Sequence, residues 1–246
     1  MPKFQDNGME THNIGGSNFQ FSAVKIDSLG ASEYTLAVIA VDCSGSVAPY
    51  KASIEKALQE AVGACRKSPR ADNLLLRVVF FDTAVHEFHG FKPLPDCNEA
   101  DYVGCLPCGG MTALYDAAYT TIKSATDLGK QMVAKQYQVN AAVFVITDGE
   151  DNASSVSRKM VADALTEARH SEALESIMPV LIGVNAQQGA LDPYLDSFKT
   201  EAGFQQFVGV TADQKTLAKL GGFISRSISS QSQSLGSGGG SQSLKF

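Results

Sequence analysis

Two short runs of unbroken apolar residues constrain this chain most, because each run leads into an aspartate. The first is Leu36–Val41, followed by Asp42, and the second is Ala141–Ile146, followed by Thr147 and Asp148. A short apolar run without alternation is typical of a strand that is covered on both faces, as in a parallel sheet. Because ligands of open parallel sheets bind beyond the carboxyl ends of the strands, the pattern predicts two carboxylates in one crevice.

Other strands and helices alternate around these two runs. Apolar residues from Val47 to Cys65 have helical spacing. We predict further strands at 19–27, 74–81, 177–184 and 205–210, a strand at 85–91 that forms a hairpin with 74–81, and helices at 114–133, 156–170, 191–202 and 212–228. This order predicts a doubly wound α/β fold, with a mostly parallel central sheet and helices on both faces.

The ends of the chain differ in composition from the rest. Residues 1–18 are polar and are expected to form a flexible arm, and residues 229–246 are so rich in Ser, Gln and Gly that we predict a disordered tail. A single domain is expected at 19–228, with 19–33 as an N-terminal strand extension.

Composition narrows the classes of function. The chain has 20 Lys and Arg against 26 Asp and Glu, a net charge of -6, and this gives no electrostatic attraction to nucleic acid or to an anionic membrane. Its apolar runs are far shorter than the roughly 20 residues of a membrane span, and the N-terminus lacks the apolar stretch of a secretory signal. The 5 cysteines lack disulfide-framework spacing. We therefore expect a cytoplasmic protein that binds neither nucleic acid nor membrane.

The segments beside the two aspartates add hydroxyl groups. After the first strand the sequence is Asp42-Cys43-Ser44-Gly45-Ser46, and a separate Gly109-Gly110-Met111-Thr112 segment precedes a helix. Carboxylate and hydroxyl oxygens with few formal charges are ligands that Mg²⁺ or Mn²⁺ accepts, and they leave the ion able to bind an outside carboxylate. The candidate metal ligands are Asp42, Ser44, Ser46, Thr112 and Asp148.

This order of motifs resembles the metal-ion-dependent adhesion site of von Willebrand factor A domains, over residues 34–228. Among such proteins, the chain is similar to stand-alone bacterial and phage-type members, the TerY-like and MoxR-associated proteins. The resemblance implies a mainly parallel sheet with one antiparallel edge strand. It also implies that the five candidate residues coordinate the metal directly or through water, and that an Asp or Glu of a partner protein completes the coordination.

Each motif alone has a simpler interpretation. Asp-x-Ser-x-Ser and Thr112 can cap helices, and Thr-Asp-Gly is typical of a turn. Glu150 and Asp151 are expected to be a solvated acidic loop. Asp116 has either a surface or capping role or a role in orienting a metal ligand. A structural zinc site is a weaker alternative, since there is only one CxxC pair; it would use Cys105 and Cys108, with Cys97 and with His86 or His89.

Three functions follow as hypotheses. The first is a metal-dependent protein-binding module without enzymatic activity, which assembles or regulates a complex with a MoxR-like AAA+ ATPase or within a stress or phage-defence system. The second is a self-assembling subunit that inserts its own carboxylate, from Asp6 or Glu10, into the metal site of the next copy. The third is a phosphatase-type enzyme, which we disfavour because the second carboxylate such enzymes need is replaced by Ser44 and no Lys or His general base stands near the motifs.

Overall fold

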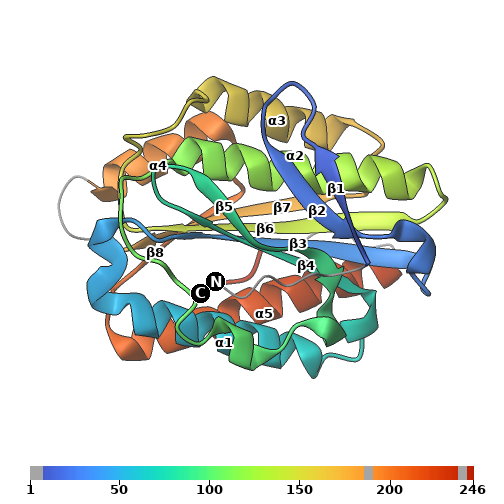
Figure 1. The fold of residues 1–246 in the computed structure, drawn as a ribbon, viewed down its shortest axis with the longest axis horizontal. Coiled ribbons are helices and arrows are strands. Elements are labelled where there is room, and N and C mark those ends of the chain that lie inside the picture. Colours follow the sequence, from blue (N-terminus) through green and yellow to red (C-terminus); the bar gives the residue numbers. More distant parts are fainter. Residues whose placement is uncertain (1–7, 186–190, 238–242) are drawn as a thin grey trace.

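Strands and helices alternate along most of the chain. The computed structural model describes residues 8–185, 191–237 and 243–246, and Figure 1 shows their arrangement. The strands are β1 (Met9–Asn13), β2 (Gln20–Val24), β3 (Glu33–Asp42), β4 (Leu74–Phe81), β5 (Val85–Pro93), β6 (Gln138–Thr147), β7 (Ile177–Val184) and β8 (Gln206–Val210). The α-helices are α1 (Lys51–Arg66), α2 (Leu114–Val133), α3 (Arg158–His170), α4 (Leu191–Ala202) and α5 (Gln214–Ser237).

The strands form one sheet in the order β1-β2-β5-β4-β3-β6-β7-β8. The five strands from β4 to β8 in this order are parallel, which confirms the predicted fold class. From β3 the chain first adds β4 on one side and later adds β6 on the other side. The strand order therefore reverses at β3 and β6, which is where open α/β sheets bind ligands. In the register of these two strands Val41 lies opposite Ile146, so both predicted carboxylates follow at the same edge.

Helices cover both faces of the sheet. In Figure 1, α2 and α3 lie along one side of the sheet and α1 and α5 along the other. The two apolar runs contact both layers, because alternate residues of β3 and β6 belong to the two opposite core clusters. Helices α1 and α5 approach closely: a Cβ built on Gly221 of α5 would lie 2.5 Å from the carbonyl oxygen of Ala57 on α1. Glycine permits this contact, since any side chain there would force the helices apart.

The antiparallel pairs lie toward one edge of the sheet, where β1, β2 and β5 form a larger region than the single antiparallel edge strand that the resemblance implied. Strand β5 pairs antiparallel with β4, but β2 lies beyond it, parallel to β5, and β1 pairs antiparallel with β2. Phe21 and Ala23 of β2 are buried, and the Phe21 ring packs edge-on against Phe91 of β5. The sequence predicted the strand at 19–27 but not its neighbour, because strand pairing depends on this distant contact.

The two terminal segments are more ordered than their composition predicted. Part of the predicted flexible arm, Met9–Asn13, is strand β1, and part of the predicted disordered tail, residues 229–237, continues helix α5. The side-chain amide of Gln231 donates to the Ala141 carbonyl at 3.2 Å and to Ser176 Oγ at 2.9 Å. Polar side chains thus dock this part of the helix through long-range hydrogen bonds, which a composition rule does not detect. Residues 1–7 and 238–242 lie outside the described residues.

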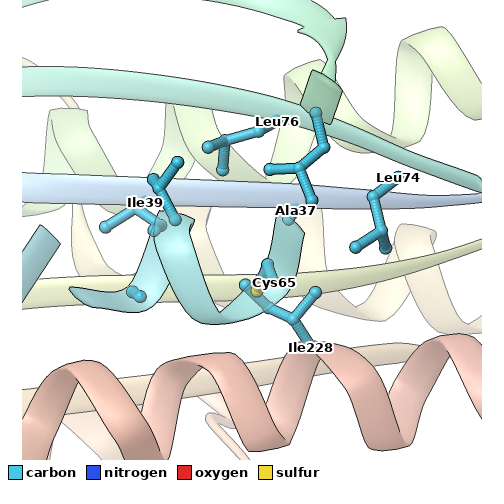
Figure 2. Close-up of a pocket in the computed structure, with 9 residues that line it drawn as sticks. Ala37, Ile39, Cys65, Leu74, Leu76 and Ile228 are labelled. Atoms are coloured by element: carbon cyan, nitrogen blue, oxygen red, sulfur yellow. The ribbon is translucent and has the colours of Figure 1, made fainter. Parts of the chain in front are cut away.

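A small pocket lies between the sheet and the α1–α5 layer (Figure 2). Its lining includes Ala37 and Ile39 of β3, Leu76 of β4, Cys65 of α1 and Ile228 of α5. The lining is apolar and includes none of the candidate metal ligands, so the pocket belongs to the packing of the core. Across the described residues, the helices all fall short of the combination of length and hydropathy that a membrane span requires.

Candidate metal site

The first candidate loop begins where β3 ends. Asp42 is 1% exposed; its Oδ1 accepts the backbone N–H of Ser44 at 2.8 Å, and its Oδ2 accepts the hydroxyl of Thr147 at 2.7 Å. The bond to Ser44 bends the chain back over the carboxylate, which is a common use of aspartate after a strand. Asp42 is therefore fixed by both adjacent strand ends before any ligand arrives.

The second carboxylate meets this loop from β6. Ser46 Oγ donates to Asp148 Oδ1 at 2.9 Å, and Ser44 Oγ lies 3.1 Å from Ser46 Oγ. Ser44 is buried, whereas Ser46 is exposed. A chain of hydrogen bonds thus connects four of the five predicted residues, and it extends from the protein interior to the surface.

The third loop reaches the site through its backbone. The N–H of Gly109 donates to the Cys43 carbonyl at 2.8 Å, and the N–H of Gly45 donates to the Gly110 carbonyl at 3.3 Å. Gly110 has a φ of +74°, a conformation that favours glycine. These contacts place the segment before Thr112 directly beside the first loop.

Thr112 lies beside the Asp148 loop. Its N–H donates to the side-chain oxygen of Asn152 at 2.7 Å, and its carbonyl accepts the N–H of Asn152 at 2.9 Å. A Cβ built on Gly149 would lie 3.4 Å from Thr112 Oγ1, so the hydroxyl faces the residue that follows Asp148. The N-cap of α2 is Ala113 and makes no side-chain cap bond, so the structure does not use Thr112 as the N-cap.

The electrostatics of the site favour a cation. Burial raises the pKa of Asp42, although bonds from Thr147 and Ser44 oppose this effect. Burial and the nearby charge of Asp42 raise the pKa of Asp148 to about 6. Among the described residues, no salt bridge involves either carboxylate. Two neighbouring carboxylates and three hydroxyl-bearing residues, with no cationic side chain paired to them, fit a hard divalent cation.

Acidic residues behind the site hold the Asp148 loop. The carboxylate of Asp116 accepts the N–H groups of Ser155 at 3.0 Å and Val156 at 2.9 Å. Asp151 Oδ1 accepts the N–H of Tyr115 at 3.3 Å, whereas Glu150 is exposed. Asp116 therefore fixes the loop that follows Asp148 and does not bond to Asp148 itself. Asp151 is not a simple solvated charge, since it bonds to the backbone of Tyr115.

Tyr50 contacts the site, and the sequence analysis did not assign it there. Its hydroxyl donates to Asp148 Oδ2, while its ring packs against the core cluster on the α1–α5 side. Tyr50 contributes to the apolar spacing of the predicted helix from Val47 to Cys65, and this spacing gives no indication of where a phenol hydroxyl points. The only signal in the sequence that could place Tyr50 at the site is its position. It lies eight residues after Asp42, on the segment that follows the first loop.

The alternative zinc site lacks a suitable cluster. The described residues contain no group of three or more His, Cys, Asp or Glu side chains placed to hold a metal ion. The two ring nitrogens of His89 lie 3.0 Å from the Gly90 carbonyl and 2.7 Å from the Tyr102 hydroxyl, so both are already engaged.

Comparisons with known proteins identify the fold. No family model matches the sequence, and the search of curated proteins finds no match. Among solved structures, the chain is similar to proximal thread matrix protein 1 from the mussel byssus "with zinc occupied MIDAS motif", with 19% identity and a TM-score of 0.52, over 79% of this chain and 46% of that one.

A bacterial minor pilin and a pilus adhesin have a similar fold. The PilB minor pilin of Streptococcus sanguinis has a D319A mutant structure that is 14% identical, with a TM-score of 0.56, over 89% of this chain and 66% of that one. The pilus adhesin SpaC of Lactobacillus rhamnosus GG is 9% identical, with a TM-score of 0.60, over 92% of this chain and 33% of that one. The chain thus spans between a third and two thirds of the length of these proteins. At such low identities the likeness establishes the fold, a von Willebrand factor A-like α/β sheet, and nothing finer.

Proposed function

We propose that this protein binds one divalent cation, Mg²⁺ or Mn²⁺, and uses it to recognise a carboxylate of a partner protein. The residues that would hold the cation are Asp42, Ser44, Ser46, Thr112 and Asp148. The observation that carries the proposal is the convergence of two carboxylates and three hydroxyl-bearing residues, from three loops, at the point where the strand order reverses. When bound there, the cation would supply a positive charge with an open coordination position, which attracts an Asp or Glu side chain.

The chemistry of the ligand set supports binding rather than catalysis. Hydroxyl ligands do not neutralise a divalent cation, so the site favours an outside anion. The position two residues after Asp42 carries Ser44, whose Oγ lies 3.1 Å from Ser46 Oγ, in place of the carboxylate that a phosphatase of this sheet type needs. We therefore propose a non-enzymatic binding module that assembles or regulates a protein complex.

The setting of that complex is a finer proposal, which rests on the sequence resemblance alone. A MoxR-like AAA+ ATPase, or a component of a stress or phage-defence system, would be the partner. Self-assembly is the second candidate, in which one copy's carboxylate enters the next copy's site. Glu10 is exposed on the outermost strand β1 and can supply that carboxylate; Asp6, the other residue considered, lies outside the described residues.

Partner capture tests the proposal. The purified protein is incubated with native lysate in Mg²⁺ and in EDTA, with Asp148→Ala as the variant and Asp163→Ala, an exposed aspartate on α3, as the matched control. Partners that are retained in Mg²⁺ but lost with EDTA and with Asp148→Ala support metal-mediated recognition. Partners that bind equally in all conditions would contradict it. Sedimentation of the purified protein in Mg²⁺ and in EDTA distinguishes self-assembly from binding of another protein, because self-assembly would give larger species only with the metal.

A further inference from the structure

Tyr50 brings a phenol hydroxyl to the candidate metal site. It is the last residue of the short 3-10 helix Gly45–Tyr50 and directly precedes α1. The ring is half-buried against the α1–α5 core cluster, and Pro49 restricts the backbone immediately before it. The hydroxyl is therefore presented from an anchored ring rather than from a mobile surface side chain.

The two oxygens of Asp148 have different donors. Ser46 Oγ donates to Oδ1 at 2.9 Å, and the Tyr50 hydroxyl donates to Oδ2. A cation that coordinates Asp148 through Oδ2 competes with the Tyr50 hydrogen bond for the electron density of that oxygen. The Tyr50 hydroxyl then needs another acceptor, and exposed Ser46 and Gly45 mark this side of the site as open to solvent.

A carboxylate has two oxygens and can meet two requirements at once. One oxygen can coordinate a cation, and the other can accept a hydrogen bond from a neighbouring donor. Hydrogen bonds to ionised acceptors are stronger than neutral ones, and two-point contacts add geometric specificity. A donor fixed beside the ligand set distinguishes a carboxylate from a water molecule or a halide ion, which offer only one atom.

We propose that Tyr50 is a specificity-determining residue of the site, which donates its hydroxyl to the partner's carboxylate when the cation is bound and to Asp148 when it is not. This inference rests on the proposed function and deepens it, because it assigns a chain residue to the second oxygen of the incoming carboxylate. The simpler alternative is that Tyr50 only orients Asp148.

Two measurements on the same variant separate these roles. The first is the affinity for Mn²⁺ alone, followed by electron paramagnetic resonance of free Mn²⁺. The second is the affinity of the Mn²⁺-loaded protein for acetate, followed by relaxation of the acetate methyl protons. The variant is Tyr50→Phe, and the matched control is Tyr137→Phe, whose hydroxyl donates to the Ile26 carbonyl at 3.2 Å near the opposite end of β6. Thermal unfolding of both variants checks that they fold.

The proposal expects Tyr50→Phe to bind Mn²⁺ within about twofold of the wild type and to bind acetate about tenfold more weakly, the lower end of what a hydrogen bond to a charged group contributes. Tyr137→Phe should match the wild type in both. Weaker Mn²⁺ binding with unchanged acetate affinity would overturn the proposal and leave Tyr50 as a residue that orients Asp148. No change in either affinity would overturn it as well. Wild-type protein that binds no Mn²⁺ would contradict the proposed function itself, and the role of Tyr50 with it.

Discussion

The two ends of strands β3 and β6 carry polar clusters of opposite character. At the amino ends, Thr35 Oγ1 donates to Asn140 Oδ1 at 2.7 Å, and Asn140 Nδ2 donates to the Gln231 carbonyl at 2.7 Å. At the carboxyl ends lie Asp42 and Asp148, whose pKa values are raised by burial. The Thr35 and Asn140 side chains pair with each other and with the backbone, whereas neither carboxylate forms a salt bridge with any of the residues that the structure describes. This difference indicates that one end of the same strands stabilises the fold and that the other end is suited to an external ligand.

The largest change in Mn²⁺ affinity is expected from substitution of a carboxylate at the carboxyl ends of β3 and β6. Asp42→Asn should lower Mn²⁺ affinity by more than about 100-fold, which exceeds the effect of changing a residue behind the ligands. The free energy of unfolding in EDTA should not fall, because the variant removes a buried charge and keeps the shape of the side chain. Mn²⁺ titration and urea unfolding measure the two quantities, with exposed Asp163→Asn as control. Tight Mn²⁺ binding by Asp42→Asn would contradict the proposal that the carboxyl ends of β3 and β6 bind the cation.

At the amino ends of β3 and β6, a substitution should lower the stability of the fold and leave metal binding unchanged. Gln231→Ala should lower the free energy of unfolding by about 1–3 kcal/mol, because buried hydrogen-bond partners in β6 and Ser176 lose their donor. Mn²⁺ affinity should not change. The control is Gln233→Ala, since Gln233 is exposed on the same turn of α5. If urea unfolding gave the same stability for both variants, the end of α5 would not be docked as described.

A smaller effect is expected at the third loop. Thr112→Ala should weaken Mn²⁺ binding about tenfold, because one neutral oxygen is lost while both carboxylates remain. Thr112→Ser keeps the hydroxyl and should recover most of the affinity. If Thr112→Ser bound Mn²⁺ as weakly as Thr112→Ala, the threonine would act through packing of its methyl group and not through its oxygen.

The smallest effect is expected from the exposed charge beside the site. Glu150→Gln should change Mn²⁺ affinity by less than about 0.5 kcal/mol at ordinary ionic strength, since exposed charges are screened by solvent and salt. Titrations at low and at ordinary salt measure this effect. A loss comparable to that of Thr112→Ala would make Glu150 part of the ligand set.

Local sequence patterns predicted the parts of the molecule that depend on local physics. The apolar runs before Asp42 and Asp148 are central strands, because residues without polar side chains on either face must be buried on both. The loops that carry Asp42, Ser44, Ser46 and Asp148 come together because the parallel strands β3 and β6 end at the same edge. The position of Gln231 and the direction of the Tyr50 hydroxyl could not be predicted, since each depends on a contact about 90 or more residues away along the chain.

The central claim, that the carboxyl end of β3 and β6 binds a divalent cation, is tested most directly by counting bound Mn²⁺. Electron paramagnetic resonance of wild-type protein titrated with Mn²⁺ should give one bound ion per chain. Mg²⁺ should compete with Mn²⁺ for the same site. Both Asp42→Asn and Asp148→Ala should abolish Mn²⁺ binding in this titration. Wild-type protein that leaves all the Mn²⁺ free, or variants that bind it as tightly as the wild type, would contradict the account.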